Sequence, residues 1–213
     1  FDNEQRAMIG TTYKKQSREA AIKAGLPLFG TKMLHMIETV EAWIKDRQKE
    51  NDLTKPTIYV HCWRGGMRSA AVAWLLDLYG YKVIQLTGGY KAYRNWVLAQ
   101  FTIPYSLKVL GGYTGSGKTE ILHALQEKNY AVIDLERLAH HKGSAYGAIG
   151  QLPQPSQEMF ENIVAEKLFE VNKKQKSIWI EDESQRIGTV LIPTPLFHLM
   201  RNSTCYFMTI PFE

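Results

Sequence analysis

The chain has 213 residues, of which 45% are apolar, 22% charged and 11% aromatic, and its formal net charge is +5. At about 150 residues per domain, this length allows one large domain or two small ones, and the composition excludes wholesale disorder and a fibrous fold. The excess of Lys and Arg favours an anionic partner such as phosphate or nucleic acid. No apolar run reaches the roughly 18 residues that would indicate a membrane span, so we expect no membrane partner.

The cysteine content excludes two further classes of protein. Cys62 and Cys205 are the only cysteines, too few for a disulfide-rich secreted scaffold or a zinc site built from paired CxxC motifs. We therefore expect no metal cluster made by the protein alone, and a reducing, cytoplasmic setting. Because the chain begins at Phe1 and ends directly after an apolar run, we expect it to be part of a longer protein.

The N-terminal segment is predicted to be polar and only partly helical. A short helical pattern at residues 18–24 is expected to stop at Gly25 and Pro27. Apolar residues at helical spacing then predict an amphipathic helix over residues 32–50.

A parallel βαβ unit is predicted next. Residues 57–60 and 82–86 are β-branched and apolar, as buried strands are. Between them lie a loop over residues 62–68 and a helix over residues 69–79 that is apolar nearly all round, and Gly88-Gly89 precede a further helix. Strand, loop, helix and strand of these lengths indicate parallel pairing.

A second α/β unit is predicted after a linker at residues 101–106, which includes Pro104. A strand at residues 107–110, a glycine loop and a helix at residues 118–128 open this unit. Further strands are predicted at residues 131–133, 177–180 and 204–210, and Ser156 is expected to cap a long helix.

A glycine loop in this second unit matches the phosphate-binding motif GxxxxGK[ST]. Its residues are Gly112, Tyr113, Thr114, Gly115, Ser116, Gly117, Lys118 and Thr119. Glycines let successive N–H groups point at an anion, and the start of the following helix adds its positive dipole end. Lys118 can then reach terminal phosphates, and the Thr119 hydroxyl can ligate Mg²⁺. The motif predicts a bound phosphate without identifying the molecule that carries it.

Such a loop is expected to work with an acidic residue at the end of a neighbouring strand. Asp134 follows one predicted strand, and Glu181-Asp182-Glu183 follow another. The second place is closer to a Walker B pattern, so Asp182 and Asp134 are the candidates for a metal-side or catalytic acid.

The second candidate site is the segment His61-Cys62-Trp63-Arg64-Gly65-Gly66-Met67-Arg68-Ser69. A cysteine reacts as its thiolate, and loop N–H groups, a helix N-terminus and the charges of Arg64 and Arg68 should favour that form. Cys205 has apolar strand neighbours and is expected to be structural.

Two chemistries fit this cysteine loop. The pattern HCxxxxxR[ST] is the signature of cysteine phosphatases, whereas rhodaneses carry sulfur or selenium on such a cysteine, commonly in a loop one residue shorter. Leu86-Thr87-Gly88-Gly89-Tyr90-Lys91-Ala92-Tyr93 is similar to the closing segment of rhodanese domains. This second match favours the rhodanese interpretation.

A rhodanese-type loop followed by a Walker-type loop resembles the bacterial tRNA 2-selenouridine synthase family. The resemblance covers about residues 2–213 and includes segments beyond the two loops. These are Gly10 to Gln16 with Glu19-Ala20-Ala21, Gly88 to Ala92, Asp134 to Glu136, Leu138 to Gly147, and Glu181 to Ser184 with Arg186-Ile187-Gly188.

The resemblance implies a transferase that acts on the wobble uridine of the tRNAs for lysine, glutamate and glutamine. The enzyme replaces the sulfur of 2-thiouridine with selenium from selenophosphate, through an S-geranylated intermediate made with geranyl diphosphate. Cys62 would be the catalytic cysteine of selenation, with Arg64 and Arg68 beside it, and residues 112–119 would hold the geranyl diphosphate. The resemblance is also compatible with ATP or Mg²⁺ at this loop and with a selenophosphate-producing enzyme as partner.

The predicted fold class is α/β, with a rhodanese-like parallel-sheet domain at residues 1–100 and a P-loop domain at residues 107–213. The first is expected to lack its opening strands and the second its C-terminal part. The alternative function is a cysteine-dependent phosphatase, or a general sulfurtransferase, fused to a P-loop kinase. A basic run at Arg137, His140, His141 and Lys142 could meet tRNA phosphates or be a solvated face.

Overall fold

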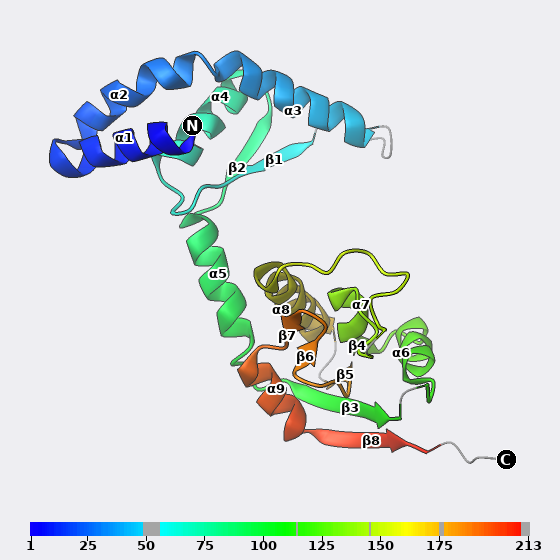
Figure 1. The fold of residues 1–213 in the computed structure, drawn as a ribbon. Coiled ribbons are helices and arrows are strands. Elements are labelled where there is room, and N and C mark those ends of the chain that lie inside the picture. Colours follow the sequence, from blue (N-terminus) through cyan, green and yellow to red (C-terminus); the bar gives the residue numbers. More distant parts are fainter. Residues whose placement is uncertain (49–55, 114, 145, 175–176, 210–213) are drawn as a thin grey trace. The chain divides into compact units, whose positions relative to one another are not determined.

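A computed structural model describes residues 1–48, 56–113, 115–144, 146–174 and 177–209, and the chain divides into two compact units, Phe1–Lys91 and Ala92–Glu213. Both contain helices and parallel strands (Figure 1), so the predicted mixed α/β class is confirmed at this level. No helix in the described part of the chain combines the length and apolar character needed to cross a membrane.

The first unit opens with three helices, α1 (Asn3–Lys15), α2 (Arg18–Gly30) and α3 (Met33–Gln48). The expected stop at Gly25 and Pro27 is wrong, because α2 continues through both residues. Ser17 caps α2 by accepting a hydrogen bond from the Ala20 N–H at 3.1 Å. A Cβ at Gly25 would lie 3.4 Å from Ile9 of α1. Packing of α1 against α2 therefore outweighs the low helix propensity of Gly and Pro.

The predicted βαβ unit is confirmed. Strands β1 (Thr57–Val60) and β2 (Lys82–Gln85) pair in parallel, and α4 (Met67–Leu78) connects them. Leu75 and Leu76 of α4 are buried, but Trp74 and Leu78 are more than half exposed. The expectation of a helix buried nearly all round is therefore wrong, since α4 has one buried and one exposed face.

The second unit is built on a parallel sheet with the strand order β4-β5-β3-β8. The strands are β3 (Ser106–Gly112), β4 (Ala131–Ile133), β5 (Ser177–Glu181) and β8 (Thr204–Met208). All four occur where strands are predicted. A short antiparallel pair, β6 (Arg186–Ile187) and β7 (Val190–Leu191), is not predicted from the sequence.

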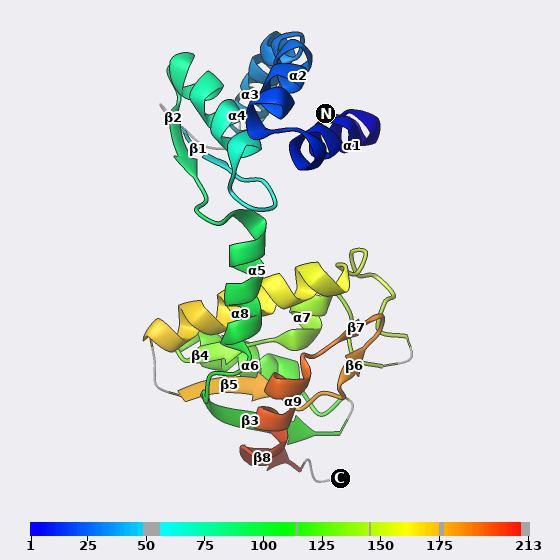
Figure 2. The same ribbon diagram turned by 90° about the vertical axis from the view of Figure 1, so that its left-hand side faces the viewer.

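Helices cover both faces of this sheet. Helix α6 (Lys118–Glu127) packs on one face, where Leu122 contacts Leu110 and Val132. The larger core lies on the other face, beneath α8 (Gln157–Lys174), which runs roughly along the strands in Figure 2. Helices α7 (Leu135–Ala139) and α9 (Thr194–Arg201), not predicted from the sequence, complete this core with the later residues of α5 (Gly89–Gln100).

The segment expected to be a linker belongs to the core of the second unit. Phe101 and Tyr105 are 3% and 4% exposed and cluster with Val97 of α5, and Ser106 begins β3. The boundary between the two units falls within α5, between Lys91 and Ala92. The prediction of an exposed connection at residues 101–106 fails because the aromatic side chains around Pro104 are needed to cover the sheet.

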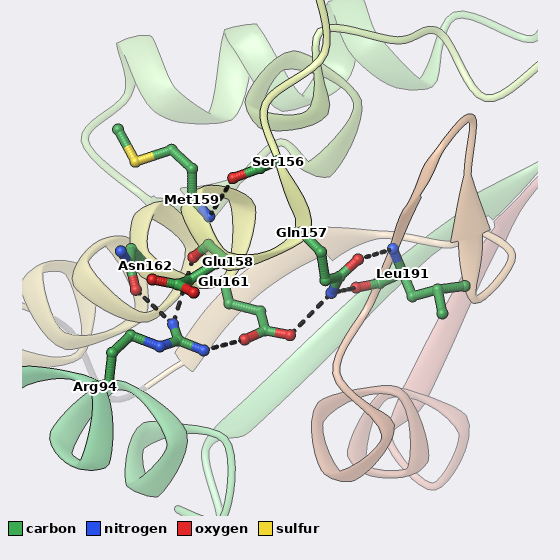
Figure 3. Close-up of polar contacts among 8 residues, drawn as sticks. All are labelled: Arg94, Ser156, Gln157, Glu158, Met159, Glu161, Asn162 and Leu191. Carbon is green, nitrogen blue, oxygen red and sulfur yellow. Dashed lines mark hydrogen bonds and ion pairs between the residues drawn. The ribbon is translucent and has the colours of Figure 1, made fainter. Parts of the chain in front are cut away.

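A polar network fixes α5 to α8 within the second unit (Figure 3). Arg94 forms an ion pair with Glu161 and donates to the side-chain oxygen of Asn162. Gln157 donates to Glu161 and to the Leu191 carbonyl, both at 2.9 Å, and accepts from the Leu191 N–H at 2.7 Å. The network therefore also holds β7.

The cap predicted for α8 is present. The Ser156 Oγ accepts a hydrogen bond from the Met159 N–H at 3.3 Å (Figure 3), which gives one of the first amides of the helix a partner.

Candidate functional site

Two glycines hold the cysteine loop in the first unit. The loop connects β1 to α4, and its Gly65 has a φ of +64°. Gly89 also has a φ of +64°, and a Cβ there would lie only 2.2 Å from both the Cys62 carbonyl oxygen and the Gly65 nitrogen. The Tyr90 N–H donates to the Cys62 carbonyl, and the Lys91 N–H to the Trp63 carbonyl, each at 2.9 Å. The Gly88-Gly89 segment therefore closes over the cysteine loop.

Hydrogen bonds activate the Cys62 thiol. Burial raises the pKa of Cys62, but the Ser69 hydroxyl and the N–H groups of Ser69, Arg64 and Gly66 lower it, and the net result is a pKa of about 7. The Ser69 Oγ lies 3.3 Å from the Cys62 Sγ and accepts a hydrogen bond from the Gln85 Nε2 at 2.9 Å. About half of the thiol is therefore thiolate at neutral pH.

The two arginines of the loop play a different part from the one expected of their charges. Arg64 lowers the pKa of Cys62 through its backbone N–H. The side chains of Arg64 and Arg68 are exposed to solvent. Amides and a hydroxyl thus favour the thiolate, and the guanidinium groups stay available to an external anion.

The phosphate loop connects β3 to α6 in the second unit. Gly115 and Gly117 have φ values of +77° and +80°, which side chains rarely adopt. The Lys118 Nζ donates to the carbonyls of Gly112 at 2.9 Å and of Tyr113 at 3.3 Å. The predicted strand, glycine loop and helix are confirmed, while Thr114 lies outside the described residues.

This loop has the features of an anion site. Ser116 is 8% exposed, and its Oγ has no hydrogen-bond partner in the described structure. Gly117 caps α6 without a side-chain hydrogen bond, so the first N–H groups of the helix face the loop. Among the described residues, the hydrogen bonds of the Lys118 ammonium group go to carbonyls of its own loop. A bound phosphate would give Ser116, Lys118 and these amides a negatively charged partner.

The two predicted acidic residues have other partners. Asp182 forms an ion pair with Arg201 of α9, and its N–H donates to the Leu110 carbonyl at 2.9 Å. Asp134 caps α7 by accepting from the Arg137 N–H at 2.8 Å. Within the described ranges, no group of three or more His, Cys, Asp or Glu is arranged to hold a metal ion.

Two glutamates that are not candidates from the sequence, Glu136 and Glu183, lie close to Lys118, and Glu181 lies beside Glu136. Burial and the charge of Asp134 raise the pKa of Glu136, and burial and Asp134 likewise raise the pKa of Glu181 to about 9. Burial and Glu136 raise the pKa of Glu183 to about 7, whereas Lys118 lowers it. The Glu136 N–H donates to the Glu181 Oε1 at 2.6 Å. The surroundings of Lys118 therefore include carboxyl groups whose pKa values are raised by burial.

The signal for these glutamates lies in the strand register. Glu181 ends β5 directly opposite Leu110, the last residue before the loop glycines. A Cβ at Gly143, which has a φ of +63°, would lie 2.5 Å from the Glu136 Oε1 and 2.7 Å from the Glu183 Oε2. Register and this glycine contact are tertiary features that the sequence alone does not reveal.

The basic run at Arg137–Lys142 does not form one solvated face. His141 is 9% exposed, and its Nδ1 has no partner among the residues that the structure describes. His141 is among the groups that lower the pKa of Glu136, so its imidazole lies near that carboxyl group. The His140 Nδ1 lies 2.9 Å from the Pro153 carbonyl oxygen. His141 is therefore buried, whereas His140 is half-buried.

Comparison with known proteins gives matches along the whole chain. A family model described as the tRNA 2-selenouridine synthase AAA domain matches residues 105–213. The tRNA 2-selenouridine synthase of Nitrosomonas europaea is 37% identical over 217 residues, which cover 99% of this chain and 54% of that protein. Those of Bdellovibrio bacteriovorus and Hydrogenovibrio crunogenus are 37% and 35% identical and are covered to 55% and 58%. The chain spans about half the length of the curated relatives it matches.

One solved structure is also similar. It is the N-terminal domain of a protein from Clostridium difficile 630 that is named for ATP/GTP binding, with 39% sequence identity and a TM-score of 0.37. The match covers 46% of this chain and 70% of that one.

Proposed function

Because the chain belongs to the tRNA 2-selenouridine synthase family, we propose that it contributes to an enzyme that converts the wobble 2-thiouridine of tRNA to 2-selenouridine. One observation carries the proposal: a chain of this family combines a thiol whose pKa is lowered to about 7 with a phosphate loop. The substrates would be the tRNAs for lysine, glutamate and glutamine, and the setting the cytoplasm. A selenophosphate-producing enzyme would be the supplying partner.

We assign the first unit to a rhodanese-like sheet. Its parallel βαβ connection, the cysteine directly after β1, and the Gly88-Gly89 segment closed over the loop support this assignment. In this proposal Cys62 is the nucleophile of the selenation step. The exposed Arg64 and Arg68 would bind the oxygens of selenophosphate, because guanidinium groups form strong charge-assisted bonds to phosphate.

We assign the geranyl-transfer step to the phosphate loop. The sulfur of 2-thiouridine would attack C1 of geranyl diphosphate, the bond from C1 to the diphosphate oxygen would break, and the N3 proton of the base would leave. Lys118 and the loop amides would bind the departing diphosphate and stabilise its developing charge. Mg²⁺, if bound, would supply further neutralisation of the diphosphate, and the Thr119 hydroxyl in the first turn of α6 would be its protein ligand.

Analysis of tRNA nucleosides by mass spectrometry tests the role of Cys62. Cells that carry only the Cys62→Ser protein are expected to lose 2-selenouridine, whereas those with Cys205→Ser, the matched exposed cysteine, are expected to keep it. Undiminished 2-selenouridine with Cys62→Ser would refute the assignment. Release of phosphate from an aryl phosphate by the purified protein would instead support the cysteine phosphatase alternative.

A further inference from the structure

Aromatic side chains flank the proposed nucleophile on both sides. His61 and Trp63 are the chain neighbours of Cys62, and both rings contact Tyr90. The ring centroids lie 5.9 Å apart in each pair, with interplanar angles of 30° for His61 and 45° for Trp63. The Tyr90 N–H is bonded to the Cys62 carbonyl at 2.9 Å. Tyr90 therefore contacts both neighbouring rings and bonds to the backbone of Cys62 between them.

Trp63 is exposed in spite of these contacts. Its relative exposure is 52%, so Tyr90 supports the ring while much of its surface faces solvent. A large aromatic residue that serves only to pack the loop would be expected to lose most of its exposure. An exposed indole directly beside the proposed nucleophile offers a planar surface on which a ligand can stack.

The charge around this cluster identifies the kind of ligand. Between residues 56 and 91 of the first unit, Asp77 is the only acidic residue, against four Lys and Arg residues. Of these four, Arg64, Arg68 and Lys91 lie in or beside the loop and are exposed. A planar aromatic surface within a cationic, nearly acid-free segment fits a polyanion with planar units, which is single-stranded nucleic acid.

We propose that Trp63 is a stacking platform for an unpaired RNA base, backed by Tyr90, with Lys91 contacting a flanking phosphate and with Arg64 and Arg68 contacting RNA phosphates until selenophosphate binds to them. The proposal rests on the proposed function, in which the base reaches Cys62 from the anticodon loop. Trp63 is a positioning residue here: it holds the base at the thiol and takes no part in bond making. A fully paired RNA cannot use such a platform, because its bases are stacked on each other.

Binding of RNA without the other substrates tests the platform. The full chain with Cys62→Ser is titrated with a fluorescent stem-loop RNA that carries 2-thiouridine in its loop. Trp63→Ala is expected to weaken binding about tenfold or more, the usual effect of removing one base–aromatic stack. Trp63→Phe, which keeps a ring, is expected to stay within about threefold of the parent. Trp74→Ala, a change of an equally exposed tryptophan on α4, is the matched control and should have no effect.

Two further measurements separate stacking from charge and from damage to the loop. Polyphosphate, which has no bases, should bind Trp63→Ala and parent protein equally. Arg68→Gln should lower the dependence of log affinity on log salt by about 0.7 for the single-stranded loop. In protein that retains Cys62, the alkylation rate at pH 7 should be the same in Trp63→Ala and in the parent.

The proposal is overturned if Trp63→Ala binds the stem-loop as tightly as Trp74→Ala does. It is also overturned if Trp63→Phe loses as much affinity as Trp63→Ala, or if duplex RNA or polyphosphate shows the same dependence on Trp63. These outcomes do not involve chemistry at Cys62. The proposed selenation activity is tested by nucleoside analysis, and it can therefore be refuted or supported independently of the stacking platform.

Discussion

The cysteine loop and the phosphate loop share one order of strand, loop and helix, and they differ in the hydrogen-bond partners of their polar groups. Each connects a parallel strand to a helix whose N-cap is a glycine without a side-chain cap, Gly66 for α4 and Gly117 for α6. In the cysteine loop, the amides donate to the chain's own sulfur. In the phosphate loop, Ser116 and Lys118 lack an anionic partner from the loop. The same order of strand, glycine loop and helix thus activates a nucleophile in the first unit and is open to an external anion in the second.

The surroundings of the two loops are also opposite in charge. Asp77 is the only acidic residue near the cysteine loop in the sequence, whereas Glu136 and Glu183 lie close to Lys118. Rising pH should therefore activate the first site, because thiolate forms, and weaken anion binding at the second, because a carboxyl group ionises. Opposite pH dependence distinguishes the two sites experimentally.

The largest effect is expected from adding a side chain where Gly89 contacts the backbone of the cysteine loop. Gly89→Ala places a methyl group 2.2 Å from backbone atoms at a left-handed φ, so it should destabilise the first unit by about 2–4 kcal/mol and abolish the enhanced reactivity of Cys62. Chemical denaturation and thiol alkylation measure the two effects. Gly10→Ala in α1, where the added Cβ meets no atom within 4 Å, is the control and should be neutral or slightly stabilising.

The next effect concerns the anion of the phosphate loop. Lys118→Ala should weaken the binding of inorganic diphosphate by about 2 kcal/mol, roughly 30-fold, because a charge-assisted hydrogen bond is lost. Calorimetric titration measures this affinity, and Lys128→Ala at the far end of α6 should leave it unchanged. The same variant should reduce geranylation of tRNA more than selenation. Equal loss of both steps would contradict the assignment of geranyl transfer to this loop.

A smaller effect is expected at the thiol. The rate of Cys62 alkylation should rise with pH through an inflection at about 7. Ser69→Ala removes the hydroxyl that favours the thiolate, so the inflection should move upward by about one unit, which corresponds to about 1.4 kcal/mol. Measurements in a Cys205→Ser background exclude the second, exposed thiol. An unchanged inflection would show that the amides alone set the pKa.

The smallest effect is expected for the affinity of the phosphate loop for diphosphate, which should fall with rising pH while the reactivity of Cys62 rises. The pKa of Glu183 is raised to about 7, so the side chain is mostly neutral at pH 6 and mostly ionised at pH 8. Diphosphate affinity should therefore fall about threefold over this range, since the new charge repels the anion. Glu183→Gln should remove the decrease. An affinity that rises with pH in the parent protein would contradict the charge argument.

The sequence predicts the loops better than their surroundings, for a physical reason. Glycine positions and the alternation of strand, loop and helix are local, and both loops lie where they are predicted. The continuation of α2 through Pro27 depends on packing against α1, and the placement of Glu181 beside Glu136 depends on strand register. Residues 101–105 resemble a linker in sequence, yet Phe101 and Tyr105 are core. Each of these features comes from contacts between distant parts of the chain.

Helix α5 limits how these units can be exchanged between proteins. Its first residues supply the amides of Tyr90 and Lys91 to the cysteine loop, and its later residues supply Val97 to the core of the second unit. A cut at the Pro104 segment would take Val97 and Phe101 from that core, and a cut after Lys91 would leave one turn or less of helix with the first unit. A gene fusion or domain swap that uses one unit alone must therefore include residues that replace the part of α5 on which that unit depends.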